Sequence, residues 1–377
     1  MVGTPRSLAR RLTTPLLLLA ILMSFSRLNQ VDPDEEVAFY SPYMYWSEAG
    51  RLRLVLRGRL YEPERDSSKR RAAIDRLIAP ALFRYIGKGP AEFDDAARAL
   101  MYERLQPFLY DGESRSTIAL RLRGAGGEAT LRLPRTDMGG SFTFATDSAG
   151  EQAVGALMGS ATHLTIEAVL PAADSRRFAT RVAEPPRRLP LLVISDVDDT
   201  VRIAEVTHKP TLAERTFLRP YEPIAGMSEL YRRLAGRGAW FHYVSGSPWQ
   251  VAPLIDQFLS DAEFPPSVMH CRQISWDFWN SDPLDTKEFK VATIRTLLAQ
   301  FRDSPVLLIG DSGEHDPEVY SEITRSHGDR LVGVWIRRVP GNWDAARLNE
   351  PRSRLGPDRV AAFESVAELN AQLDRLP

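Results

Sequence analysis

Beyond residue 190 the chain alternates short apolar runs with segments of helical periodicity, and this alternation restricts its fold more than any other feature. The apolar runs are 191–195, 240–244, 306–309 and 331–336. Helical spacing of apolar residues occurs at Met227, Leu230, Tyr231 and Leu234, then at Val251, Leu254, Ile255 and Phe258, and a third helix is expected at 290–301. Strands that alternate with helices pair in parallel through right-handed crossovers. The sequence therefore predicts an α/β domain with a parallel sheet over 191–377.

Polar side chains follow the carboxyl ends of three of these predicted strands. They are Asp196, Asp198 and Thr200 after the first, Ser245 and Gly246 after the second, and Asp311 and Asp316 after the third. Open parallel sheets bind ligands beyond this edge. Carboxylates that lie close together repel and raise each other's pKa, and Mg²⁺ with oxygen ligands removes that conflict. The alternative is that each Asp caps a turn or helix, which explains the motifs singly but not their joint position.

The ordered set of Asp-x-Asp-x-Thr, Ser, Lys and a paired-Asp strand end resembles the haloacid dehalogenase superfamily. The resemblance implies a Rossmann-like parallel sheet of that type with small cap insertions. It implies that Asp196 attacks phosphate and that Asp198 donates and accepts protons. Substrate phosphate would be bound by Thr200, Ser245, Gly246 and Lys290. Mg²⁺ would be held by Asp196, the backbone carbonyl of Asp198, Asp311 and Asp316.

A closer resemblance covers about residues 190–340 and rests on longer strings. They are 194–200 (ISDVDDT), 242–250 (HYVSGSPWQ) and 310–318 (GDSGEHDPE). These strings are similar to the catalytic domain of actin-patch-associated phosphatidate phosphatases. The resemblance implies Mg²⁺-dependent release of phosphate from the phospholipid phosphatidate, which leaves diacylglycerol. It also favours Lys290 over Lys287 as the phosphate clamp, because of its distance from the Gly310-Asp311 strand.

The first half of the chain has a different texture. Alternating apolar residues predict half-buried strands at 52–56, 118–122 and 164–170, and Ile74, Leu77 and Ile78 are spaced for one face of a helix within 67–109. We expect a β-sandwich-like accessory domain over 37–180 with a helical insertion, followed by a linker at 181–190. This half is similar to the N-terminal module of the same phosphatase family. The insertion and the leader described next depart from the eukaryotic pattern and make actin-related partners doubtful.

The N-terminal residues 1–30 have the pattern of an export signal or membrane anchor. Arg6, Arg10 and Arg11 precede an apolar core at 15–23, and the first acidic residue is Asp32. The chain is therefore expected in the cell envelope, either exported to the periplasm or anchored by this segment. The alternative is an amphipathic N-terminal helix.

Composition limits the partners. The net charge is −1, so no general field attracts nucleic acid, and none is expected as a partner. The single cysteine, Cys271, excludes disulfides within the chain and favours a buried apolar role. His315 is expected to face outward or contact substrate.

Three functions stay open from the sequence. The first is a lipid phosphate phosphatase at a membrane surface. The second is a phosphatase for soluble or protein-bound phosphate, and the third is a non-enzymatic binding module. The segments between the motifs are too short for a bulky lid, which favours a large substrate. Four aromatic residues in or beside them are candidates for a lipid interface or for the core: Trp249, Trp276, Phe278 and Trp279.

Overall fold

The computed structural model describes residues 31–63, 67–273 and 283–377. The predicted leader at 1–30 and the aromatic residues Trp276, Phe278 and Trp279 lie outside these ranges. Over the described residues, every helix is too short or too polar to span a bilayer. The chain divides into two compact units. The larger comprises 40–54, 64–110 and 184–377, and the smaller comprises the described residues up to 39 together with 55–63 and 111–183.

The larger unit contains a six-stranded sheet in the order β12-β11-β10-β13-β14-β15, in which every neighbouring pair is parallel. The strands are β10 (Leu191–Ser195), β11 (Ala239–Pro248), β12 (Ser267–Arg272), β13 (Val306–Asp311), β14 (Leu331–Arg337) and β15 (Val360–Phe363). Every residue of the central strands β10 and β13 is buried, as expected for a sheet covered on both faces. The predicted α/β class and parallel sheet are confirmed. β12 and β15 were not predicted.

Helices connect these strands, and one helix follows the last strand. They are α6 (Lys209–Phe217), α7 (Met227–Gly236), α8 (Ala252–Asp261), α9 (Pro283–Gln300), α10 (Asp316–His327), α11 (Asn349–Leu355) and α12 (Asn370–Asp374). The four apolar residues predicted to share one face of α7 are all buried. Cys271 is 2% exposed, in agreement with its predicted apolar role. α9 begins at Pro283, several residues before the predicted start.

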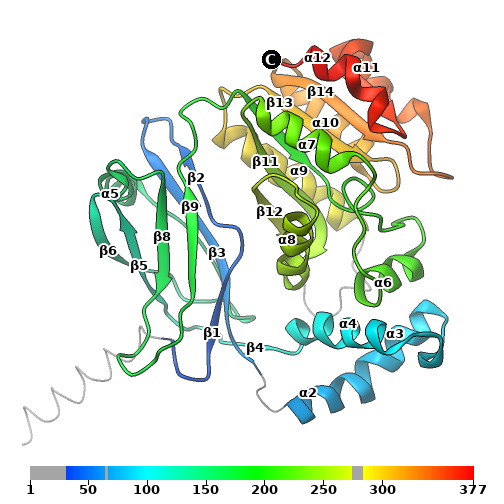
Figure 1. The fold of residues 1–377 in the computed structure, drawn as a ribbon. Coiled ribbons are helices and arrows are strands. Elements are labelled where there is room, and N and C mark those ends of the chain that lie inside the picture. Colours follow the sequence, from blue (N-terminus) through cyan, green and yellow to red (C-terminus); the bar gives the residue numbers. More distant parts are fainter. Residues whose placement is uncertain (1–30, 64–66, 274–282) are drawn as a thin grey trace, which may run out of the picture. The chain divides into compact units, whose positions relative to one another are not determined.

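A helical segment belongs to the larger unit although it lies between strands of the smaller one. It comprises α2 (Ser67–Ala73), a π-helical turn (Ile74–Ile78), α3 (Ala79–Ile86) and α4 (Asp95–Leu105). Figure 1 shows α3 and α4 beside α6, and Phe83, Met101 and Phe217 share one apolar cluster. This grouping differs from the expectation of an insertion in the β-rich domain, because the segment buries its apolar face on α6.

Leu77 departs from its predicted position on the buried helix face. Ile74 is 1% exposed, but Leu77 is 73% exposed. Pro80 has no N–H to donate to the carbonyl four residues before it, and a wider turn forms here, in which the N–H of Ala79 donates to the carbonyl of Ile74. A π turn holds more residues than an α turn, so the spacing that brings Leu77 and Ile74 to one face is lost.

The smaller unit is built from antiparallel strands. One sheet contains β1 (Glu36–Phe39), β3 (Leu52–Glu62), β4 (Asp111–Gly112) and β7 (Ser141–Ala145). β2 (Tyr43–Trp46), whose residues are counted with the larger unit, also pairs with β3. The other has the order β6-β5-β8-β9, with β5 (Ala119–Gly124), β6 (Gly127–Arg132), β8 (His163–Ala168) and β9 (Ala179–Ala183). α5 (Ser148–Met158) contacts this second sheet. The strands predicted near 52, 118 and 164 are confirmed.

Candidate active site

Asp196 extends directly from the carboxyl end of the central strand β10. Ser195, the last residue of that strand, lies level with Tyr243 of β11 and Ile309 of β13. The N–H of Asp196 donates to the carbonyl of Ile309 at 2.9 Å, which continues the pairing for one further residue. The side chain is only 4% exposed. Asp196 is therefore fixed at the middle of the sheet edge where parallel folds bind their ligands.

Two further carboxylates lie beside Asp196. Asp311 ends β13 and Asp316 begins α10, and ligand oxygens of these three residues lie within 4.8 Å of one another. The N–H of Asp311 donates to Oδ2 of Asp316 at 3.2 Å. A Cβ atom on Gly310 would lie 2.5 Å from that same oxygen, so a residue without a side chain is needed there. We call Asp196, Asp311 and Asp316 the carboxylate cluster.

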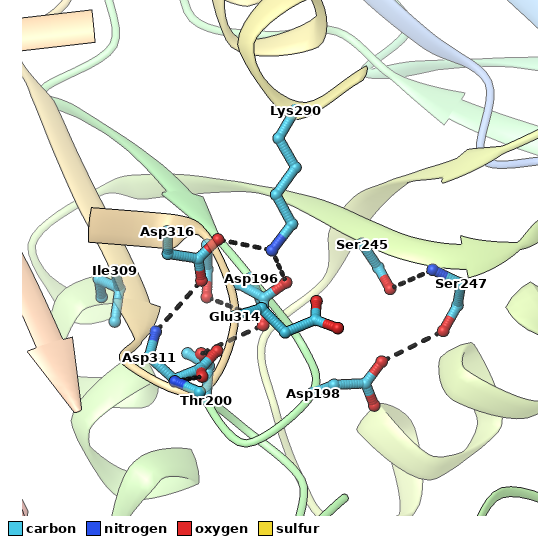
Figure 2. Close-up of polar contacts among 12 residues, drawn as sticks. Asp196, Asp198, Thr200, Ser245, Ser247, Lys290, Ile309, Asp311, Glu314 and Asp316 are labelled. Atoms are coloured by element: carbon cyan, nitrogen blue, oxygen red, sulfur yellow. Dashed lines mark hydrogen bonds and ion pairs between the residues drawn. The ribbon is translucent and has the colours of Figure 1, made fainter. Parts of the chain in front are cut away.

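Lys290 of α9 is the cation of the cluster. Its Nζ donates to Oδ1 of Asp196 at 2.7 Å and to Oδ1 of Asp316 at 2.5 Å, as Figure 2 shows. The residue is 2% exposed. Lys287, the other candidate, lies 3.9 Å from Glu322 and is one-third exposed. The structure thus brings Lys290, and not Lys287, to the predicted site.

The charges of the cluster do not balance. Three carboxylates carry −3 and Lys290 carries +1, which leaves −2 in a buried space. Burial, and after it the neighbouring carboxylates, raise the pKa of Asp311 well above its ordinary value. Burial likewise raises the pKa of Asp196, although Lys290 opposes this. For Lys290 burial lowers the pKa, but attraction by Asp196 and Asp316 outweighs it and the net direction is upward. A divalent cation with oxygen ligands would cancel the excess charge, and this donor set fits Mg²⁺.

The side chain of Asp198 lies outside the carboxylate cluster. Its Oδ1 accepts from Nε of Arg202 at 2.5 Å, and its Oδ2 accepts from the hydroxyl of Ser247 at 3.2 Å (Figure 2 shows the contact with Ser247). Arg202 is 1% exposed and its guanidinium lies 4.3 Å from the ring centre of Tyr221. These contacts fix the carboxylate beside the cluster. The predicted metal contact of Asp198 was through its backbone carbonyl, and it stays a prediction.

Asp199 organises the loop that carries Asp198. Its φ of 54° lies in the left-handed region, which non-glycine residues seldom adopt. Its carboxylate accepts from the N–H groups of Ala204, Glu205 and Val206 at 2.7 to 3.0 Å. No role was predicted for Asp199, Arg202 or Ser247. An arginine four residues after Asp198 was the available signal for Arg202, but such spacing is common on surfaces.

The remaining predicted residues surround the cluster. Thr200 is fully buried, and its hydroxyl lies 3.3 Å from Oδ2 of Asp196 and 3.4 Å from Oδ2 of Asp311. It therefore links two carboxylates, and its predicted contact with substrate phosphate stays a prediction. Ser245 is also fully buried, and its Oγ accepts from the N–H of Ser247 at 3.0 Å. Gly246 lines the cleft described next.

A cleft of about 830 Å³ opens over Asp198. Its lining includes apolar residues, among them Leu212, Ala213 and Phe217 of α6 and Tyr85 of α3. It also includes the polar residues Lys209, Arg272 and His315. His315 thus lines the cleft, and its contact with substrate stays a prediction. The ring of Trp249 stacks on Tyr40 at 4.9 Å and packs on the core, which supports the core alternative for this residue.

The segment that contains these site residues is similar to known proteins. Residues 191–338 match the family model described as phosphatidate phosphatase APP1, catalytic domain. An uncharacterised protein of Schizosaccharomyces pombe is 32% identical over 152 residues, which is 39% of this chain and 25% of that protein. Phosphatidate phosphatase APP1 of Saccharomyces cerevisiae is 30% identical over 149 residues, 38% of this chain and 25% of that protein. The chain thus spans about a quarter of the length of these curated relatives. Residues 191–338, which contain the carboxylate cluster, Lys290 and Asp198, are thus similar to the catalytic domain of the phosphatidate phosphatase family.

Proposed function

We propose that the chain is a Mg²⁺-dependent phosphatidate phosphatase of the haloacid dehalogenase type, with Asp196 as its nucleophile. The observation that carries the proposal is the carboxylate cluster at the end of β10, with Asp196 held by Lys290 at 2.7 Å. The match of residues 191–338 to a phosphatidate phosphatase catalytic domain supports the substrate class. The six-stranded parallel sheet and its short connections between motifs are consistent with that fold type and its small caps.

Asp196 and Asp198 divide the chemistry between them. In the first step a carboxylate oxygen of Asp196 forms a bond to phosphorus while the bond from phosphorus to the lipid oxygen breaks. Asp198, in its protonated form, gives its proton to that leaving oxygen, and diacylglycerol departs. In the second step Asp198 takes a proton from water, whose oxygen attacks the phosphorus of the aspartyl-phosphate. Phosphate leaves and Asp196 returns to its carboxylate form.

The surrounding residues position these two groups. The contacts of Arg202 and Ser247 hold the Asp198 carboxylate, and those of Thr200 and Lys290 hold Asp196. Lys290, Ser245 and Gly246 would bind the phosphoryl oxygens as fixed donors. Mg²⁺ would be held by Asp196, Asp311, Asp316 and the backbone carbonyl of Asp198. When bound, it supplies positive charge that offsets the negative charge of the phosphoryl group.

A phospholipid suits the cleft, since its lining combines apolar and cationic side chains. Leu212, Phe217 and Tyr85 offer a surface for acyl chains, and Lys209 and Arg272 offer cations for the headgroup. The leader pattern at 1–30 would bring the enzyme to the cell envelope, where phosphatidate is held in a bilayer. Soluble or protein-bound phosphomonoesters are the competing substrates.

Phosphate release from a panel of phosphate esters tests the proposal. Phosphatidate in vesicles should be hydrolysed only with Mg²⁺ and faster than water-soluble esters, and the acid-quenched protein should retain labelled phosphate on Asp196. Asp196→Asn should remove both turnover and label. The matched control is Asp303→Asn, which changes an exposed carboxylate and should keep full activity. Turnover by Asp196→Asn would refute the mechanism, and a preference for soluble esters would refute the lipid substrate.

A further inference from the structure

One face of the helical run 67–88 is buried and the opposite face carries exposed apolar residues. Ile74, Leu82, Phe83 and Ile86 pack in the cluster with α6. On the opposite face Leu77, Ala81 and Tyr85 are exposed at intervals of four residues, which places helical neighbours in one row. Leu77 is 73% exposed and Tyr85 is 40% exposed, and these are two of the three large apolar side chains that are exposed among the described residues. We call Leu77, Ala81 and Tyr85 the apolar row.

Basic residues border the apolar row. Residues 67–88 contain six basic residues and one acidic residue, Asp75, a net charge of +5 in a chain whose total is −1. Arg76 and Arg84 each precede a member of the row by one position and are exposed. Neither makes a side-chain hydrogen bond or ion pair within the part of the chain that the structure describes. Lys88, by contrast, is paired with Glu214. Two cationic side chains thus remain available beside the row.

The apolar row ends at the cleft. Tyr85 lines the same cavity as Asp198 and Ser247, so the exposed face of α3 forms part of the cleft wall. A surface that contacted Leu77 and Ala81 would therefore lie against the mouth of the cavity that contains the candidate acid and base.

We propose that residues 67–88 dock the enzyme on anionic phospholipid bilayers. Leu77 and Ala81 enter the interface between headgroups and acyl chains, and Arg76 and Arg84 bind lipid phosphates. The pattern of an apolar row bordered by unpaired arginines is that of a helix that lies on a membrane surface. Charge complementarity selects an anionic bilayer as the occupant, since each basic residue near such a surface adds attraction. The choice of a lipid rests on the proposed function, because a phosphatidate phosphatase must reach a headgroup held in a bilayer.

A single-cysteine probe tests contact at the row itself. The one native cysteine, Cys271, is buried, so Leu77→Cys in the full chain offers one accessible thiol for an environment-sensitive fluorophore. The emission should shift to the blue with vesicles of phosphatidylcholine and phosphatidylserine, and stay unchanged with phosphatidylcholine alone. High salt should reverse the shift, because it screens the arginines. The probe reports its own surroundings, so any binding by residues 1–30 does not produce the signal.

A charge-reversal pair supplies the second test. Arg76→Glu with Arg84→Glu should weaken binding to phosphatidylserine vesicles about tenfold or more, since it replaces two attractions by repulsions. Hydrolysis of a water-soluble ester should be unchanged. The matched control, Arg233→Glu with Arg325→Glu, makes the same change in net charge at exposed positions on α7 and α10 and should bind as the unaltered chain does.

The outcomes separate this proposal from the proposed function. An equal shift with neutral vesicles, no shift at all, or equal weakening by both charge-reversal pairs would overturn membrane docking. A shift caused by RNA or by a protein, and not by vesicles, would do so as well. Vesicle binding does not require turnover, so it is also measured in the Asp196→Asn background. If the Asp196→Asn variant binds vesicles and the unaltered chain does not hydrolyse phosphatidate, membrane docking is supported and the proposed phosphatase activity is refuted.

Discussion

The guanidinium of Arg202 donates from Nε to Oδ1 of Asp198 at 2.5 Å, and both residues come from one loop four positions apart. Arg202 is almost completely buried, and burial alone would lower its pKa, but attraction by Asp198 raises the pKa overall. The charge of Arg202 is thus permanent, and it determines where the proposed acid and base points.

Replacement of this arginine tests that relationship. Arg202→Lys keeps the charge but loses the planar donors and the stacking on Tyr221. We expect kcat on a soluble phosphate ester to fall about 10- to 100-fold, because small displacements of catalytic groups are costly. KM should change little, and steady-state kinetics give both values. A rise in KM at constant kcat would contradict a role in positioning Asp198, and a parallel melting curve separates loss of fold from loss of rate.

The excess negative charge of the cluster predicts stabilisation by a divalent ion. Mg²⁺ should raise the melting temperature of the full chain by several degrees at saturating concentration, because it binds only the folded state. Asp311→Asn removes a buried ligand and should lose this increase. The control Asp303→Asn should retain it. Equal increases in all three proteins would mean that the ion binds elsewhere.

The stability of the metal-free protein should depend on pH through the same carboxylates. Burial raises the pKa of Asp196 and Asp311, so above the ordinary carboxyl pKa of about 4 the folded state binds more protons than the unfolded chain. The free energy of unfolding then falls as the pH rises from about 4 toward the raised values. Urea unfolding with a chelator should show this decline, and Asp311→Asn should make it less steep. Mg²⁺ should oppose the decline, since it requires ionised ligands. A decline of equal slope in Asp311→Asn would contradict the assignment.

Glu214 on α6 forms an ion pair with Lys88, which follows α3 in the helical segment. Its side chain is 10% exposed and binds Lys88 at 2.5 Å and Arg219 at 2.7 Å. Burial raises its pKa, but the bonds from Lys88 and Arg219 outweigh this and lower it overall. The contribution is therefore present above the ordinary pKa and is lost as the pH falls through the lowered one.

Glu214→Gln should accordingly cost about 1 kcal/mol of unfolding free energy at neutral pH. The difference from the unaltered chain should shrink as the pH falls below about 4 and vanish once the pH lies below the lowered pKa of Glu214. Urea unfolding at both pH values measures it. Glu322→Gln, at a pair whose carboxylate is more exposed, is the control and should cost less. If the difference in unfolding free energy persisted in acid, the cost of Glu214→Gln would come from packing and not from the charge of Glu214.

The parallel strands and most site residues were predictable because each depends on local sequence. Continuous apolar runs identify buried strands, and the residue after such a strand must lie at the sheet edge, which located Asp196 and Asp311. The predictions failed in two places for different reasons. The position of Leu77 depends on a local π turn next to Pro80, which a regular helical spacing does not include. The partner of the helical segment is α6, more than a hundred residues later, and local sequence does not identify it.

The sequence by itself determined the parallel architecture, the family motifs and the set of carboxylates that meet at one edge, because strand periodicity and the order of motifs are written along the chain. Tertiary structure alone decided which oxygens face one another. It placed Lys290 within hydrogen-bond distance of both Asp196 and Asp316, and it paired Asp198 with Arg202. It also brought Tyr85 to the lining of the cleft. These contacts depend on side-chain packing over distances of a few ångströms, and local sequence carries no measure of such distances.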